Sequence, residues 1–372
     1  DASIIAFTLG ENESFNITCT HIDTPAFMIK PKNTIYEKNY LKINVMPYGG
    51  LLNYAWLDEP LSIAGRVILK KKDTYYKEII DLKEPLFCIP SVAIHQNENA
   101  NDDLKLNSQI DMMPILSLKD TKEPIKKLIA KKIKRKEGEE IADFDLFLYT
   151  TETPIYFGME KEMILSPRID DLSCTFSSLK GFLESKKNKN NNLFCAFNSE
   201  EIGSLTKEGA DSSFLMDILK RIAAETKKDI SILINNSTIL SADNTHATHP
   251  NHPNNSDTNN EALLNKGIVI SKDASSTTDS ITSSLFKGIC EKAKVPYQDF
   301  VTKNDMTSGS TLSGISLRHV SIDSIDIGLG QLAMHGAKEV IGSKDAYYLY
   351  QAFKEFYETK ITKAKDQIKV SK

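Results

Sequence analysis

The second half of the chain alternates between short apolar runs and longer segments whose apolar residues recur at helical spacing. The short runs predict β-strands at residues 193–197, 238–242, 267–270, 300–303 and 322–327. The longer segments predict helices at residues 170–183, 214–224, 280–293 and 346–357. Strands that alternate with helices predict a sheet covered by helices, so the expected fold class is α/β.

The first half of the chain is richer in strand patterns. Residues 3–9 and 15–20 predict a pair of strands around the polar turn 10–13. Residues 41–46 predict a further strand, and short β-type runs then alternate with charged residues from 61 to 88. These runs predict a β-rich region that differs from the α/β pattern of the second half.

The α/β pattern begins after Phe144. We therefore predict a discontinuous main domain, residues 1–57 and 144–372, that is interrupted by a β-rich inserted domain at residues 58–143. The basic run 126–136 lies inside this insert and carries apolar residues at helical spacing, which favours a solvated amphipathic helix over a membrane or nucleic-acid patch. Residues 251–260 are rich in Asn and Pro and predict a loop.

The composition is that of a globular protein and excludes several classes of function. The 372 residues are 40% hydrophobic and 26% charged, with a formal net charge of −4. That balance argues against a nucleic-acid-binding protein, which would carry an excess of basic residues. No apolar stretch approaches the roughly 20 residues of a membrane span, and no secretory leader pattern opens the chain. The five cysteines form no Cys-x-x-Cys pair, so we expect free thiols and a cytoplasmic location.

Two adjacent acids, Glu200 and Glu201, directly follow the predicted strand 193–197. Two carboxylates side by side repel each other unless a cation lies between them. A metal centre is one arrangement that supplies the cation, with one carboxylate as a ligand and the other as a base toward water. Glu-Glu pairs are more often simply exposed and solvated, so the pair alone is a weak signal.

Further metal-type residues lie at the ends of other predicted elements. His21 ends a strand, and Asp23, two residues later, would face the same side and could accept the second imidazole N–H. Asp170, Asp243 and His335 also lie at element ends, where a helix cap, a turn acid and a half-buried polar residue are the structural alternatives. Imidazole and carboxylate ligands without thiolates suit Zn²⁺, Mn²⁺ or Co²⁺. The carboxylates outnumber the needs of one tetrahedral zinc and suit two metals that share a bridging carboxylate.

Several motifs along essentially the whole chain together resemble the aspartyl aminopeptidase / aminopeptidase I family of dinuclear zinc metallo-aminopeptidases. The motifs are His21-Ile22-Asp23-Thr24-Pro25, Ala64-Gly65-Arg66-Val67, Pro90-Ser91-Val92-Ala93-Ile94-His95, Pro167-Arg168-Ile169-Asp170-Asp171-Leu172, Glu200-Glu201-Ile202-Gly203-Ser204, Ser241-Ala242-Asp243 with His246 and His249-Pro250, Asn304-Asp305-Met306 with Gly309-Ser310-Thr311, and Gln331-Leu332-Ala333-Met334-His335.

The resemblance implies a role for each candidate residue. His21 and Asp243 would bind one zinc ion, Glu201 and His335 a second, and Asp170 would bridge the two. Glu200 would be the general base of metal-assisted hydrolysis, and His246 would hydrogen-bond the developing oxyanion. The reaction would release the N-terminal amino acid from peptides.

The resemblance also implies an architecture and an assembly. The main domain would have the phosphorylase/hydrolase-like fold, a mixed sheet layered by helices, and the β-rich insert would be a dimerisation domain. The subunits would form a tetrahedral homododecamer built from dimers. His95, in the insert, would reach the active site of a neighbouring subunit; a zinc ligand and a buried structural histidine remain alternatives for this residue.

The sequence departs from the family pattern at the specificity strand. Aspartyl-specific members place a Lys where this chain has Ser271, and Lys272 is displaced by one residue, which in a strand turns a side chain to the other face. Preference for an acidic or a neutral N-terminal residue is therefore open. Ser308 also replaces the usual small Cys of the family. Two alternative functions are a catalytically silent scaffold of the same fold and a dinuclear deacylase of N-acyl amino acids.

Overall fold

The computed structural model describes residues 2–102, 104–134, 136–306, 312, 318–364 and 367–371, which form two compact units. The first, which we call the α/β unit, comprises residues 1–24, 154–334 and 339–372. The second, the β-rich unit, comprises residues 25–153 and 335–338. These bounds differ from the predicted insert at 58–143, because two strands that precede residue 58 pair with the sheet of the β-rich unit.

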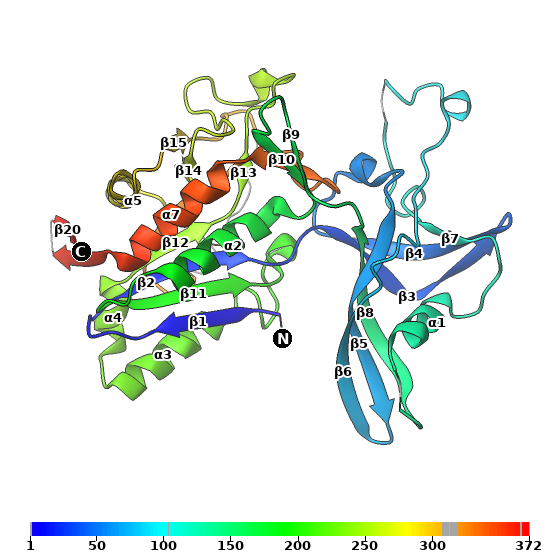
Figure 1. Ribbon diagram of the computed structural model, residues 1–372, viewed down its shortest axis with the longest axis horizontal. Coiled ribbons are helices and arrows are strands. Elements are labelled where there is room, and N and C mark those ends of the chain that lie inside the picture. The colour runs from blue at the N-terminus through cyan, green and yellow to red at the C-terminus, as the bar shows by residue number, and fades with distance from the viewer. Residues whose placement is uncertain are drawn as a thin grey trace. The chain divides into compact units, whose positions relative to one another are not determined.

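A mixed seven-stranded sheet forms the centre of the α/β unit (Figure 1). Its strand order is β1 (Ile4–Thr8), β11 (Asn191–Phe197), β2 (Phe15–His21), β12 (Thr238–Ala242), β16 (Asp323–Gly328), β14 (Ile268–Ser271) and β15 (Tyr297–Phe300). The strands β11, β2, β12 and β16 run parallel to one another. The edge strand β1 is antiparallel to β11, and β14 is antiparallel to β16 but parallel to β15. The carboxyl ends of β11, β2 and β12 consequently meet at one edge of the sheet.

Helices cover both faces of this sheet, as the sequence predicts for an α/β fold. One core packs the sheet against α2 (Ile169–Glu184), α5 (Ser280–Ala293) and α7 (Asp345–Glu358). Figure 1 shows α2 and α7 side by side over the sheet. The other core packs the sheet against α3 (Phe214–Thr226) and α4 (Ile230–Asn236).

The alternation of residues along β2 explains its central position. Phe15, Ile17 and Cys19 point into the core shared with α3 and α4. The intervening Thr18 is also buried, and its hydroxyl bonds the Ser178 hydroxyl of α2 at 2.7 Å. Because every residue of β2 is buried, the strand holds its last residue, His21, at a fixed place at the carboxyl edge of the sheet.

The remaining elements of the α/β unit form two smaller sheets. One has the order β13 (Thr245–His246), β17 (Gly330–Leu332), β18 (Glu339–Gly342), β10 (Met163–Ser166) and β9 (Ile155–Phe157). The other is the hairpin of β19 (Lys360–Ala364) and β20 (Gln367–Ser371). Short 3₁₀ turns lie at Glu200–Ile202 and Pro253–Asn255.

The β-rich unit is built on an antiparallel six-stranded sheet. Its order is β6 (Thr74–Asp81), β5 (Leu61–Lys71), β8 (Glu140–Thr150), β3 (Ala26–Glu37), β4 (Tyr40–Tyr48) and β7 (Ile115–Ser117). The predicted basic helix is α1 (Pro124–Lys132), whose Ile125 and Ile129 are buried while most of its lysines are exposed. Short 3₁₀ turns lie at Asn53–Trp56 and Ile94–Gln96.

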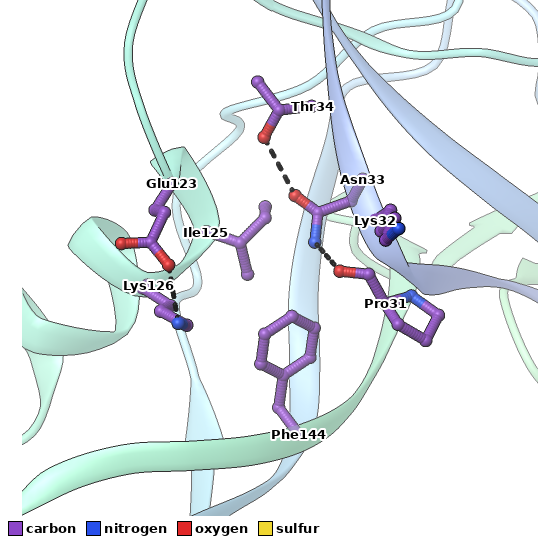
Figure 2. A pocket seen from close by; sticks show the side chains of 8 residues that line it. All are labelled: Pro31, Lys32, Asn33, Thr34, Glu123, Ile125, Lys126 and Phe144. Atoms are coloured by element: carbon purple, nitrogen blue, oxygen red, sulfur yellow. Dashed lines mark hydrogen bonds and ion pairs between the residues drawn. The ribbon is translucent and has the colours of Figure 1, made fainter.

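A surface pocket of about 290 Å³ lies in the β-rich unit between β3, α1 and β8 (Figure 2). Ile125 and Phe144 form its apolar part, and the Lys126 ammonium pairs with the Glu123 carboxylate at 2.5 Å. The lining contains none of the residues that the sequence proposes as metal ligands. Among the described residues, no helix has the length and apolar character that crossing a membrane requires.

Several local predictions need correction. The strands at 3–9 and 15–20 exist but do not pair with each other, because β11 inserts between β1 and β2. The strand predicted at 300–303 is β15, which ends at Phe300. The strand β3, the helix α4 and the β19–β20 hairpin have no counterpart in the sequence prediction.

Two glycines in helix interiors provide a test of this packing. At Gly181 in α2, an added Cβ would lie 2.8 Å from the Phe353 Cβ and 2.9 Å from the Lys354 nitrogen of α7. At Gly288 in α5, an added Cβ would meet no heavy atom within 4 Å. We expect Gly181→Ala to lower the free energy of unfolding by about 1–3 kcal/mol through overpacking. We expect Gly288→Ala to raise it by about 0.5–1 kcal/mol. Denaturant unfolding of both variants measures the difference, and similar effects at the two positions would contradict the α2–α7 packing.

Candidate metal centre

His21 lies among carboxylates at the edge where β2, β11 and β12 end. Its Nε2 atom is 3.3 Å from Asp170 Oδ1 and 3.5 Å from Asp243 Oδ1, and its side chain is only 1% exposed. Its backbone N–H donates to Asp171 Oδ2 at 3.1 Å. The sequence places these residues far apart, and the parallel strand order brings them together.

Asp23 orients both the histidine and the glutamate pair. Its backbone carbonyl lies 3.0 Å from His21 Nδ1, closer than its carboxylate at 3.5 Å, so the carbonyl rather than the predicted carboxylate is the nearer partner. The carboxylate instead accepts from the backbone N–H groups of Glu200 at 3.1 Å and Glu201 at 3.2 Å. One residue thereby fixes the imidazole ring and the turn that presents the two glutamates.

The start of α2 is held from two sides. The Asp170 backbone N–H donates to Glu339 Oε2 at 3.0 Å, and both residues are buried. Asp171 is fully buried and bonds the His21 backbone. Asp171 and Glu339 are not among the site residues predicted from the sequence. Asp170 and Asp171 are adjacent acids, like Glu200 and Glu201, and this pattern could have identified Asp171 as a site residue. No sequence pattern around Glu339 indicates that it belongs to the site.

Burial and crowding raise the pKa values of the acids in this cluster. Desolvation, followed by the neighbouring Asp243 carboxylate, raises the pKa of Glu200 to about 8. Desolvation and the Asp170 carboxylate raise the pKa of Glu201 to about 10. Burial likewise raises the pKa of Asp243 and of Asp171. The protein alone therefore supplies too little positive charge for this many carboxylates.

His21 can carry a positive charge inside this cluster. Burial opposes its charged form, but hydrogen bonds to Asp170, Asp23 and Asp243 outweigh that effect and raise its pKa well above the usual value. A proton on His21 thus offsets part of the negative charge when no metal is bound.

The donor atoms of the cluster suit a divalent cation. One nitrogen or oxygen atom from each of His21, Asp171 and Asp243 lies within 4.8 Å of the others, and the same holds for His21, Glu200 and Glu201. Imidazole nitrogen and carboxylate oxygen without thiolates form the ligand set expected for zinc. The arrangement fits a metal centre that several carboxylates share.

Three further predicted residues are histidines: His246, His95 and His335. His246 is exposed on β13 in the α/β unit, where β13 pairs with β17. His95 is an exposed residue of a 3₁₀ turn in the β-rich unit. His335 belongs to the β-rich unit, directly after Met334 of the α/β unit, and its carbonyl accepts from the Leu52 N–H at 3.1 Å. Ser308 and the motif 309–311 lie outside the described residues.

Comparison with known proteins shows that nearly the whole chain is similar to one family. The profile described as "Aminopeptidase I zinc metalloprotease (M18)" matches residues 1–357. A "Probable M18 family aminopeptidase 2" of Clostridium novyi is 41% identical over 373 residues, which cover 96% of this chain and 86% of the relative. A "Probable aspartyl aminopeptidase" of Ricinus communis is 31% identical over 413 residues and covers 96% of this chain and 84% of the relative.

Solved structures show the same similarity. A chain in "the Ape4 and Nbr1 complex", solved by cryo-EM, has a TM-score of 0.90 and 32% identity, covering 96% of this chain and 74% of that chain. The S. cerevisiae mApe1 dodecamer has a TM-score of 0.82 and 26% identity, covering 96% of this chain and 83% of that chain.

The raised pKa values of Glu200 and Glu201 predict a pH dependence for the zinc-free protein. Between about pH 4.5 and about 8, the folded state keeps protons on these acids that the unfolded state has released. Stability falls with pH wherever the folded state binds more protons, so the free energy of unfolding should decrease over this range. Zinc should reverse the trend, because it displaces the protons and binds more tightly as the pH rises.

Denaturant unfolding of zinc-free protein from about pH 5 to about pH 8 measures this slope. The double variant Glu200→Gln/Glu201→Gln is the control, because its neutral amides cannot titrate and the slope should shrink. Stability of the wild-type protein that rises with pH would contradict the electrostatic account of the cluster.

Proposed function

Because the chain belongs to the aminopeptidase I (M18) family of zinc metalloproteases, we propose a role for each member of its carboxylate–histidine cluster. The protein is a zinc-dependent aminopeptidase, a hydrolase that acts on peptide bonds. The observation that carries our residue assignment is the crowding of partly or fully buried acids around His21, whose negative charge needs a cation for compensation. The names of the relatives favour this reaction over the deacylase alternative.

The proposed ligands divide into two sets. His21 and Asp243 bind one zinc ion, which the 3.5 Å separation between His21 Nε2 and Asp243 Oδ1 supports. Glu201 and His335 bind a second, an assignment that rests on the sequence motifs. Asp170 is shared, which its position 3.3 Å from His21 Nε2 supports. Mn²⁺ and Co²⁺ suit the same ligand types. Zinc bound here would polarise the peptide carbonyl and make water a better nucleophile at neutral pH.

Glu200 is the proposed general base. Its backbone is fixed by the Asp23 carboxylate, and its own carboxylate neighbours the cluster without being one of the assigned ligands. Once cations compensate the negative charge, the Glu200 carboxylate can accept a proton from the attacking water and then donate it to the leaving amine. His246 would hydrogen-bond the carbonyl oxygen as negative charge develops there.

We also propose that the β-rich unit mediates self-association. Support comes from the solved S. cerevisiae relative, which is a dodecamer. The assembly would be a tetrahedral homododecamer built from dimers, and the inserted unit would carry the dimer contact. His95 in this unit would then contact the substrate of a neighbouring subunit. Such an enclosed enzyme would process peptides in the cytoplasm.

The neighbouring residues Glu200 and Glu201 provide a matched test of the two roles. Glu200→Gln keeps the side-chain shape but cannot accept a proton, so kcat should fall by roughly 10²–10⁴-fold. Its zinc content should stay unchanged. Glu201→Gln should instead lose zinc, because it removes a charged ligand. Peptidase assays combined with metal analysis distinguish the variants, and near-normal turnover of Glu200→Gln would remove Glu200 as the base.

Substrate specificity depends on the cation available to the side chain of the N-terminal residue. Ser271, at the position of the family lysine, ends β14 and is half-buried, and it carries no charge. Lys272 is exposed, and its charge acts on the Asp279 carboxylate. Hydrogen bonds from Thr282 lower the pKa of Asp279, and the positive charge of Lys272 lowers it further. Because Asp279 is the N-cap residue of α5, the charge of Lys272 acts at the start of that helix. We therefore propose a weak or absent preference for acidic N-terminal residues.

Replacement of Ser271 tests this specificity. A buried charge-assisted hydrogen bond is worth roughly 1.5–3 kcal/mol, or about 10- to 150-fold in kcat/KM. Ser271→Lys should raise the ratio of kcat/KM for Asp or Glu substrates to that for Leu or Met substrates. Lys272→Ser is the control and should leave the ratio unchanged. A wild-type enzyme with strong selectivity for Asp or Glu, abolished in Lys272→Ser, would show that Lys272 supplies the cation.

A further inference from the structure

We infer that Asn244 is a positioning residue that sets the distance between the segments bearing Asp170 and Asp243; this inference rests on the proposed function. Asn244 directly follows Asp243 at the end of β12 and is 8% exposed. Neither its position nor its residue type marks it as a metal ligand. Its importance lies in the number of separate segments that its amide joins.

The amide of Asn244 makes hydrogen bonds to two other segments of the α/β unit and so joins three. Its Nδ2 donates to the Gln331 Oε1 atom at 2.7 Å, the Ser173 Oγ atom at 2.9 Å and the Ile169 carbonyl at 3.2 Å. Its Oδ1 accepts from the Leu329 backbone N–H at 3.2 Å and from the Cys174 thiol at 3.3 Å. The segments are the start of α2, the β16–β17 connection with β17, and the end of β12.

The orientation of the amide follows from these partners. The Leu329 backbone N–H can only donate, so the atom that faces it must be the oxygen of Asn244. Nδ2 then faces the Ile169 carbonyl, which can only accept. Both contacts agree on one orientation, so neither a rotated amide nor an isosteric carboxylate satisfies both partners.

Each of these segments continues into a proposed ligand. Ile169 immediately precedes Asp170, and Ser173 and Cys174 lie on the same helix. Asn244 itself is bonded to Asp243, and the chain of β17 continues to His335. The amide thus fixes the backbone on either side of the His21 imidazole, whose Nε2 lies within 3.5 Å of both Asp170 and Asp243. Partners that orient ligands typically change metal affinity by about 10–100-fold when they are removed.

A neutral amide suits this place better than an acid. Asn244→Asp would present an oxygen to the Ile169 carbonyl and add a carboxylate beside acids whose pKa values are already raised. Gln331 could rotate its own amide to donate to the new acid, but the Ile169 carbonyl could not respond. Asn244→Asp should therefore weaken zinc binding although it preserves the shape of the side chain.

The test compares Asn244 with a second buried asparagine of the same unit. Asn191 is 2% exposed, and its Nδ2 donates to the carbonyls of Asn12 and Ser14 while its Oδ1 accepts from the Gly10 N–H. It lies at the start of β11, at the opposite end of the strand from Glu200. Asn191→Ala therefore removes a comparable set of hydrogen bonds without contact to the proposed ligands.

The measurement is zinc affinity by competition with a chromophoric chelator, together with the denaturation midpoint of each zinc-free variant. We expect both alanine variants to lose stability, and only Asn244→Ala and Asn244→Asp to bind zinc at least about 10-fold more weakly. If Asn244→Ala does not fold, Ser173→Ala removes one hydrogen bond of the same network and should weaken zinc binding by about 2- to 10-fold.

Three results would overturn the inference by different routes. If folded Asn244→Ala binds zinc as tightly as the wild-type protein does, the positioning role is wrong but the ligand assignment stands. Where Asn244→Ala does not fold, the same result for Ser173→Ala leads to the same conclusion. A wild-type protein without tight zinc binding removes the ligand assignment, and the inference with it. Equal loss of zinc affinity in Asn191→Ala and Asn244→Ala would show that general destabilisation, not positioning, weakens binding.

Discussion

Repulsion among crowded, partly or fully buried carboxylates is the constraint on which the rest of this structure depends. Glu200, Glu201 and Asp243 are partly buried and converge on His21, and desolvation and mutual repulsion raise their pKa values. Such an arrangement stores unfavourable electrostatic energy unless cations are bound. Residues that are not proposed metal ligands hold the carboxylates in this arrangement. Asp23 holds the glutamate turn, Glu339 holds the Asp170 backbone, and Asn244 joins α2 to β12.

Much of the proposed site could be predicted from sequence because its residues directly follow regular elements. His21 ends β2, Glu200 follows β11, and Asp243 follows β12. An apolar run that stops at a polar residue is a local signal, and parallel strands place such residues at one edge. The helix at 280–293 was also predicted with its observed bounds, since its apolar spacing is regular.

The supporting contacts could not be predicted because they join residues that are distant in sequence. Glu339 bonds the Asp170 backbone across 169 positions, and Asn244 reaches Gln331 across 87. The pairing of β1 with β11 rather than β2 was missed for the same reason, because a turn-like sequence favours a hairpin. The predicted insert began too late, at residue 58, because the pairing of β3 with β8 spans the whole insert.

A crystal structure of zinc-loaded protein, with anomalous diffraction data collected at the zinc absorption edge, would test the central claim most directly. Our account predicts anomalous density about 2.0–2.2 Å from the side chains of His21 and Asp243, with Asp170 shared with a second peak. The proposed metal centre would be contradicted if zinc were found away from these side chains. It would also be contradicted if the carboxylates were crowded together without any cation between them.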